Sequence, residues 1–568
     1  MEALLHLVYL QVVVFIFLTI TAGIAVFVYL RWFYVDFAKV EGIPEIPGGG
    51  LVSGHLYMLG ENHAATAEKW SEEHNWPIYQ LRMGNRRAIM LNSFDVAKEW
   101  IITNQTGTID RPWMYTFHGV VSSTSAATIG TSPWDERTKK RRRIVGSLTT
   151  GPSIQRLKPL FDMESTAMIE GMYRYSNGGL LEIMPHDFAK RLALNIVTMF
   201  CYGTRFSSIE DPLLHQILND ANRIARWALI LLFKQNLPVD MQLTALCSFR
   251  STNSNTQDYI PHLRFFSNQK RTAEAIEVRT RRDRWLSTML DRVRSAIATG
   301  KGKPCVAEGL LKDKDERLTK DDVKIILGGL MSGAFETMFS TIIICIGVLS
   351  TPEGQAIQQS TYEDIMNTYP TAEEAWKRCL LEEKCQSVIG LVRETLRFYS
   401  PLKLLPPRQT YKEFNYNGSK IPKGLMVYIN AQAINRDKSK YGPDADRFRP
   451  SRWHSPPTSS HPVPSPPPPP PYHFSYGAGS RMCTAVNFSN RVLYIVFLRL
   501  VLSFKMVQSS SMPPNVDYMD YNRNFKASNA ISKDFKVTFV PREKGGQDMW
   551  VRESWKEVRG LDLGGGEN

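Results

Sequence analysis

A cysteine at the end of a glycine-broken loop is the residue of this chain best suited to metal chemistry. The loop covers residues 474–485, and an apolar helical pattern follows over residues 486–504. Backbone N–H groups at a helix start and the charge of nearby Arg481 both favour a thiolate at Cys483, and a thiolate is a strong metal ligand. Gly479 lets the backbone pass close under a flat cofactor. We therefore expect a metal-bound cofactor at Cys483, with Arg481 as a partner for a carboxylate.

The spacing within this loop resembles the haem-binding loop of the cytochrome P-450 monooxygenases. Arg481 and Gly479 stand two and four positions before Cys483, as they do in that family. Tyr476 stands where the family usually has Phe, and Ala485 where it usually has Gly. The resemblance implies that Cys483 is the axial thiolate ligand of iron in haem b, a ligand that favours O–O cleavage. It also implies that Arg481, Gly479 and Tyr476 contact this cofactor. A buried free cysteine after a glycine-rich turn is the alternative.

A carboxyl and a hydroxyl group lie side by side in a second apolar stretch, residues 325–346, which predicts a long buried helix. Glu336 and Thr337 each cost free energy there unless they have a partner. A threonine in a helix can bond back to a carbonyl one turn earlier and open a groove for water or dioxygen. In the resembling family the matching pair helps to deliver protons to bound dioxygen, so Glu336 and Thr337 are the expected catalytic residues. Ala334 stands where the family more often has Gly, and a buried threonine beside a surface glutamate is the alternative.

Two further positions resemble contacts to the haem propionates. Arg408, after Pro407, matches a strand arginine of the family. Trp134 opens a basic helical segment, and in the family a Trp here acts together with a basic residue one helical turn later. This chain has Thr138 at that place and Lys139 one position further. Trp134 is therefore an expected cofactor contact, and its basic companion stays open.

Three residues are expected to support the haem loop without taking part in catalysis. Glu394 and Arg397 lie three apart in a predicted helix over residues 384–398 and can pair on one face. In the family a later arginine, matched here by Arg452, joins this pair in a buried network. Ser451 replaces the acid that the family usually has beside that arginine.

The apolar segment at the N-terminus predicts a membrane anchor. Residues 4–30 contain no Asp, Glu, Lys or Arg, and as a helix of about 1.5 Å per residue they span roughly 40 Å, more than a hydrocarbon core needs. The run is longer than the apolar core of a cleaved signal peptide, which is the alternative. We expect an anchor over 1–31, a proline and glycine hinge over 32–50, and a monooxygenase domain over 51–545. That domain is mostly α-helical with a smaller β part, as the cytochrome P-450 resemblance implies.

Composition narrows the class of protein further. The chain has 568 residues, a net charge of +14 and seven scattered cysteines without a CxxC pair, which argues against a disulfide framework or zinc site. The positive charge suits an acidic partner or an anionic membrane as well as nucleic acid, but the anchor makes nucleic acid a poor candidate. Residues 455–471 end in six consecutive prolines and predict an extended insertion, and residues 546–568 predict a flexible tail.

The chain shows no motif that would bring electrons to a haem. It has no G-x-G-x-x-G after a strand, no P-loop and no iron–sulfur cysteine spacing. The resemblance therefore implies a separate partner, NADPH-cytochrome P-450 reductase, in the same membrane. It further implies an endoplasmic reticulum location, one membrane pass and a catalytic domain on the cytosolic side.

The amino-acid sequence of four segments resembles the fungal phenylacetate hydroxylase group of this family: residues 43–47, 63–67, 129–136 and 477–483. Two substrate hypotheses follow. The preferred one is oxidation of an aromatic or alkaloid-like small molecule in fungal secondary metabolism, such as mycotoxin biosynthesis, and the alternative is ring hydroxylation of phenylacetate-type aryl acids in catabolism. Related isomerases and dehydratases tend to lose the acid–threonine pair, which is present here. The last hypothesis is a haem-deficient membrane scaffold that recruits partners through its proline run.

Overall fold

The computed structural model describes residues 2–32, 34–121, 128–206, 217, 256–264, 269–313, 318–454, 472–525 and 527–542. Within these ranges the chain is mostly α-helical with a smaller β part and one apolar N-terminal helix, as predicted. The predicted proline-rich insertion and flexible tail lie outside the described residues.

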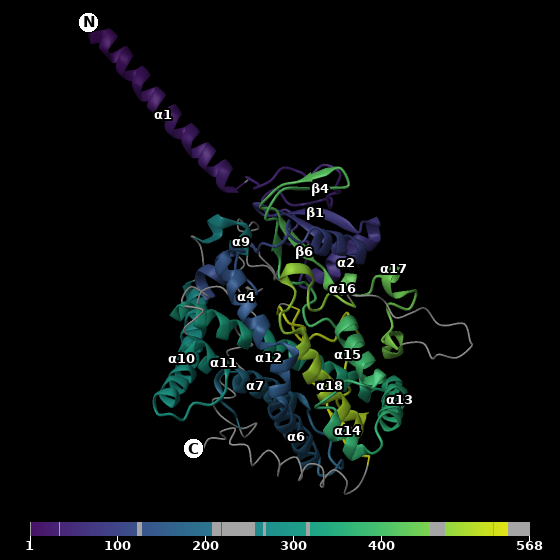
Figure 1. The fold of residues 1–568 in the computed structure, drawn as a ribbon. Coiled ribbons are helices and arrows are strands. Elements are labelled where there is room, and N and C mark those ends of the chain that lie inside the picture. The colour runs from purple at the N-terminus through teal and green to yellow at the C-terminus, as the bar shows by residue number, and fades with distance from the viewer. Residues whose placement is uncertain are drawn as a thin grey trace.

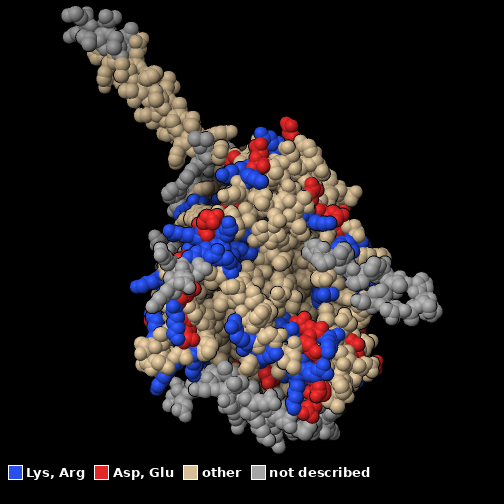
Figure 2. Space-filling model, in the orientation of Figure 1, with Lys and Arg blue, Asp and Glu red and all other residues tan. Residues whose placement is uncertain are grey.

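The N-terminal helix α1 (Glu2–Trp32) stands away from the rest of the protein (Figure 1). Its stretch Tyr9–Tyr29 has 21 residues, and none of that stretch is buried. At about 1.5 Å per residue it is roughly 30 Å long, which matches the hydrocarbon thickness of a bilayer. On the face drawn in Figure 2 the described part of α1 carries no charged side chain, whereas the body carries many of both signs. The helix is therefore long and apolar enough to cross a membrane.

The body of the protein is built from helices of very different lengths. The longer ones are α2 (His63–His74), α4 (Glu136–Leu148), α6 (Lys158–Tyr175), α7 (His186–Tyr202), α10 (Gln269–Ala298), α12 (Lys320–Ser350), α13 (Pro352–Thr368), α15 (Gln386–Phe398) and α18 (Val486–Ser503). The shorter ones are α3 (Phe94–Lys98), α5 (Gly151–Arg156), α9 (Thr256–Tyr259), α11 (Val306–Lys312), α14 (Ala372–Arg378), α16 (Ala431–Ile434) and α17 (Lys438–Tyr441). Two π-helical segments, η1 (Glu99–Thr103) and η2 (Tyr115–Val121), and three 3-10 turns, η4 (Pro261–Arg264), η5 (Pro450–Trp453) and η6 (Gly479–Arg481), complete the set of described helices.

Helix α12 runs through the middle of the body (Figure 1). Thr319 caps its start, because the Thr319 side chain accepts from the Asp322 N–H while the Asp322 carboxylate accepts from the Thr319 N–H. Helices α7, α13 and α18 pack against α12. Both α12 and α18 are apolar enough to span a membrane, but each is mostly buried in the protein and is therefore a core helix.

Most of the β part lies at the end of the body nearest α1 (Figure 1). Its main sheet has the order β1-β2-β6-β3, formed by β1 (Ile78–Met83), β2 (Arg86–Leu91), β6 (Met426–Ile429) and β3 (Arg408–Gln409). Two antiparallel pairs accompany it, β4 (Phe414–Tyr416) with β5 (Ser419–Ile421) and β7 (Phe504–Gln508) with β8 (Val537–Pro541). The main sheet and the β4–β5 pair lie at the end nearest α1, whereas the β7–β8 pair packs against α6, α12, α13 and α18. Arg408 opens β3 opposite Val427, so the sheet fixes the backbone of this predicted cofactor contact.

Candidate functional site

A cavity of about 680 Å³ lies inside the body, and most of its lining is apolar. It is bounded by α12, the loop over residues 474–485 that carries Cys483 (the cysteine loop), the loop after Arg111 and the segment before β3. Six of the predicted site residues line it: Cys483, Arg481, Tyr476, Arg408, Glu336 and Thr337. The fold thus brings these six residues, which are far apart in the sequence, to one cavity.

Cys483 lies just before the start of α18, and its side chain lines the cavity. Its N–H donates to the Tyr476 carbonyl at 2.8 Å. Burial raises the pKa of the thiol, while the Ala485 N–H and the charge of Arg142 act in the opposite direction and favour the thiolate. Arg142 is therefore the guanidinium whose charge favours the thiolate in this structure, and the predicted effect of Arg481 stays a prediction.

Gly479 has φ +60°, and a Cβ at this position would collide with the Ile101 carbonyl of η1. Close packing against η1 thus explains this glycine, whereas the predicted approach to a flat cofactor stays a prediction. Trp134 is not among the residues that line the cavity. The Arg481 guanidinium, which does line it, lies 5.6 Å from the centre of the Trp134 ring.

Four arginines converge at the cavity. Arg408 and Arg481 are only 1% and 4% exposed, and Arg111 is also buried. Arg408 Nη2 donates to the Ala478 carbonyl at 2.7 Å, Arg481 Nη2 to the Ser132 carbonyl at 2.7 Å, and Arg111 Nη1 to the Pro407 carbonyl at 2.8 Å. The fourth, Arg142, donates to the Met482 carbonyl at 2.7 Å.

Among the described residues none of these four arginines forms an ion pair with a carboxylate, although the charges of Asp110 and Asp135 act on Arg481. Arg408 Nε and Arg481 Nε and Nη1 are buried without a hydrogen-bond partner among the described residues. Burial, followed by repulsion from neighbouring arginines, lowers the pKa of Arg408 and Arg481 to about 9. Buried like charges are costly unless anions join them. The thiol and the unsatisfied arginine donors therefore fit a metal-bound group that carries carboxylates, and haem is such a group.

For the basic companion of Trp134, which the sequence leaves open, α4 offers one candidate that lines the cavity. Thr138 is buried, and its hydroxyl donates to the Pro133 carbonyl at 2.9 Å. The Lys139 side chain is 62% exposed. Arg142, one helical turn after Thr138, reaches the cavity instead. Sequence reasoning missed Arg142 because a run of basic residues usually marks a solvated face, and it missed Arg111, which no local pattern distinguished.

Glu336 is buried with 5% exposure, so the alternative of a surface glutamate is wrong. The Asn529 side-chain amide donates to its Oε2, and Oε1 has no hydrogen-bond partner among the described residues. Burial raises the pKa of Glu336 to about 7, against the opposing effects of the Asn529 bond and the charge of Arg523. Thr337 Oγ1 donates to the Gly333 carbonyl at 2.8 Å, the predicted bond to the preceding turn.

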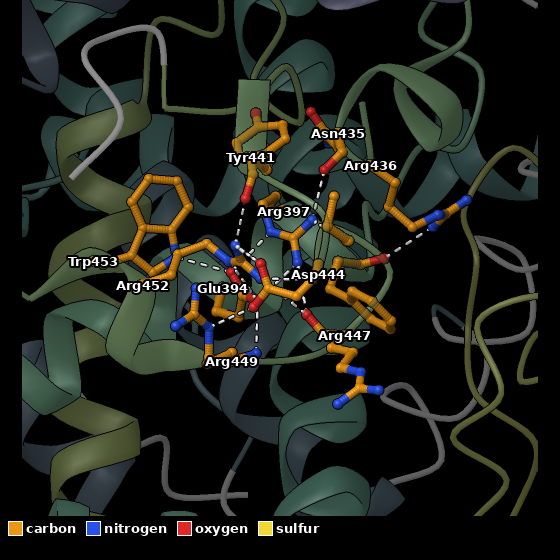
Figure 3. Close-up of polar contacts among 12 residues, drawn as sticks. Glu394, Arg397, Asn435, Arg436, Tyr441, Asp444, Arg447, Arg449, Arg452 and Trp453 are labelled. Atoms are coloured by element: carbon orange, nitrogen blue, oxygen red, sulfur yellow. Dashed lines mark hydrogen bonds and ion pairs between the residues drawn. The ribbon is translucent and has the colours of Figure 1, made fainter. Parts of the chain in front are cut away.

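The network predicted to support the loop is fully buried around Glu394 (Figure 3). Arg397 makes two bonds to Glu394, Nη2 to Oε1 at 2.7 Å and Nε to Oε2 at 2.8 Å. Arg452 Nε lies 3.3 Å from Glu394 Oε1, and its Nη1 lies 3.1 Å from Asp444 Oδ1. Asp444 thereby supplies the acid that Ser451 does not.

This network is linked to the cysteine loop through Asn435. Arg397 Nη1 donates to the Asn435 carbonyl at 2.8 Å, and Asn435 Oδ1 accepts from the Phe474 N–H at 2.7 Å. Asn435 Nδ2 also lies 3.0 Å from the Ser475 hydroxyl. The Glu394 network therefore fixes the first residues of the loop that carries Cys483.

Comparison with known proteins agrees with this geometry. The family model for cytochrome P-450 matches residues 44–523. The chain is 36% identical to phenylacetate 2-hydroxylase of Emericella nidulans over 95% of this chain and 99% of that protein, and 31% identical to 3-hydroxyphenylacetate 6-hydroxylase of the same organism over 89% and 90%. A zebrafish cytochrome P-450 solved with progesterone has the same fold, with a TM-score of 0.63 and 16% identity over 84% of this chain and 99% of that one.

Proposed function

The chain belongs to the cytochrome P-450 monooxygenase family, and on this premise we propose that it hydroxylates the ring of a small aromatic acid. The two Emericella nidulans relatives described above are named for phenylacetate-type substrates. The observation that carries the proposal is the single cavity of about 680 Å³ that joins Cys483, the arginines and the Glu336–Thr337 pair. Cofactor and substrate must share this volume, which favours a small substrate.

The residues that line the cavity have different roles toward the cofactor. Cys483 would hold the haem iron, and Arg111, Arg142, Arg408 and Arg481 would hold its propionates. Thiolate-bound haem supplies the redox chemistry that cleaves the O–O bond. The net reaction consumes dioxygen, two electrons and two protons, places one oxygen atom in a C–H bond and releases the other in water.

Glu336 and Thr337 supply the proton path. A carboxyl with a pKa of about 7 can both release and regain a proton near neutral pH. The Thr337 hydroxyl donates its own proton to the Gly333 carbonyl, so its oxygen is left to accept a hydrogen bond from a water in the cavity. Most of the lining around this path is apolar, so few polar groups compete for the water that it holds.

We further propose how the protein obtains electrons and how it is attached to a membrane. The body over residues 51–545 receives electrons from NADPH through a separate reductase. The segment 1–31 anchors it by one pass through the endoplasmic reticulum membrane, with residues 32–50 as a hinge and the body on the cytosolic side. The exposed apolar helix α1 supports the anchor.

A second candidate substrate is an aromatic or alkaloid-like scaffold of secondary metabolism. The departures of Ala334 and Ala485 from the usual glycines favour it, but the departure at Ser451 no longer does, because Asp444 takes over the contact to Arg452. The aryl acid is therefore the first choice.

The test is a spectrum followed by a product screen. The reduced, carbon monoxide-bound protein should show the long-wavelength Soret band of thiolate-bound haem, Cys483→Ala should lose it, and Cys305→Ser should keep it. Phenylacetate, NADPH and reductase should then give a hydroxyphenylacetate. A haem spectrum without any hydroxylated aryl acid would favour the second substrate, and the absence of haem would favour the scaffold hypothesis.

A further inference from the structure

The buried carboxyl of Glu336 is held by a side chain that lies outside its own helix. The Asn529 amide donates to Glu336 Oε2, and both residues are buried and line the cavity. Glu336 Oε1 has no hydrogen-bond partner within the described part of the chain. The contact with Asn529 therefore fixes where the carboxyl points.

The turn that carries Asn529 is fixed independently of Glu336. The Ala530 N–H donates to the Pro401 carbonyl at 2.8 Å. The Ile531 N–H donates to Asn522 Oδ1 at 3.2 Å, and the Arg523 N–H donates to the Ile531 carbonyl at 2.8 Å. The backbone thus presents the amide of Asn529 to α12 as a preformed partner.

Titratable groups on α7, which packs against α12, and on the segment that carries Asn529 contact other described residues. Arg523, whose charge reaches Glu336, has its Nη1 3.7 Å from Asp534 Oδ1. On α7, His186 Nε2 also lies 3.7 Å from Asp534 Oδ1, and Lys190 stands over the face of a ring on α12. The direct partner of Glu336 is therefore a neutral amide.

A neutral amide suits an acid that must change its protonation state. Lys and Arg can only donate, so they hold a carboxylate and oppose its protonation. A carboxamide both donates and accepts, so it can bond to the charged and to the neutral form. We propose that Asn529 is the positioning residue for Glu336: it holds the carboxyl at the cavity wall in both protonation states. This inference rests on the proposed proton-delivering role of Glu336 and not on the identity of the substrate.

The test compares two oxidants in the haem-bound enzyme. Dioxygen with NADPH and reductase needs delivered protons, whereas hydrogen peroxide brings the oxygen atom together with its own protons. In Asn529→Leu, a change of similar size without polar atoms, we expect NADPH-driven product formation at saturating substrate to fall about tenfold. Peroxide-driven product formation should change by less than about twofold.

The matched control is Asn515→Leu, because Asn515 Nδ2 makes the same kind of bond, 2.7 Å to Asp520 Oδ2, at the surface of the same segment. It should leave both rates unchanged. Glu336→Gln should reproduce the selective loss of the NADPH-driven rate.

A readout without turnover follows the carboxyl itself. The infrared band of protonated Glu336, identified as the band lost in Glu336→Gln, should persist to higher pH in Asn529→Leu, because the bond that favours the carboxylate is gone. Asn529→Asp should move it further in the same direction, because a second carboxylate opposes ionisation.

The results distinguish the positioning role of Asn529 from the proton-delivering role of Glu336. An equal fall with both oxidants, or an unshifted infrared titration, would overturn the positioning role of Asn529 while leaving that of Glu336 intact. A Glu336→Gln variant that loses nothing selectively would remove the proton-delivering role, and the inference with it.

Discussion

At the scale of single residues, Arg142 links α4 to the cysteine loop by donating to carbonyls on both sides of Arg481. Hydrogen bonds from a charged donor contribute about 1.5–3 kcal/mol, so Arg142→Ala should weaken haem retention roughly tenfold or more. The Soret absorbance that survives a haem scavenger measures this. Lys139→Ala, on the exposed face of the same helix, is the matched control, and an equal loss in both variants would contradict the assignment of Arg142.

His473, just before the cysteine loop, makes the protein sensitive to acid. Burial, with smaller effects from Arg393 and Arg397, lowers the pKa of His473 to about 3. Below about pH 6.5 His473 is protonated in the unfolded chain but stays neutral in the folded protein. The free energy of unfolding therefore falls with pH in this range, by up to about 1.4 kcal/mol per pH unit.

His473→Asn removes this linkage. The variant should lose less stability than the parent between pH 7.5 and 5.5, by roughly 1 kcal/mol, in chemical unfolding followed at both pH values. Parallel pH dependence in the two proteins would show that the ring is not buried in its neutral form. His74→Asn, a change at an exposed histidine, is the matched control.

At the scale of elements, the Glu394 network joins α15 and η5 to the loop. Glu394→Gln leaves Arg397 and Arg452 without their buried counterion, and breaking such a pair costs about 3–5 kcal/mol. Asp444→Asn affects a partly exposed pair and should cost about 1 kcal/mol or less. Melting temperature and haem content measure both. Similar effects of the two changes would mean that Asp444 carries as much of the network as Glu394.

The sequence predicts those parts of the site that lie in short segments with fixed spacing. The cysteine loop and the Glu336–Thr337 pair are of this kind, as are the helices that carry them. Arg142 escaped prediction because its partner loop lies 338 residues later in the chain. The contact of Asn529 with Glu336, across 193 residues, escaped for the same reason. Such contacts depend on how whole elements pack, and no local pattern records them.

At the scale of the whole molecule, α1 and the body are separate enough to be tested apart. Removal of residues 2–31 takes away the exposed apolar helix but none of the residues that line the cavity. The shortened protein should keep its carbon monoxide spectrum and leave the membrane fraction after high-salt washing. Loss of the spectrum on truncation would show that the body needs the anchor to fold.

The four arginines that converge at the cavity also affect how much of the protein accumulates in a cell. Until an anionic cofactor arrives, like charges face one another inside the fold and oppose its completion. A ligand that binds only the folded chain stabilises it by mass action, so stability rises with the concentration of free haem. Quality control removes chains that remain unfolded. The steady-state abundance of this protein should therefore follow the haem supply of its host. Because of the arginines at the cavity, only the haem-bound protein would accumulate.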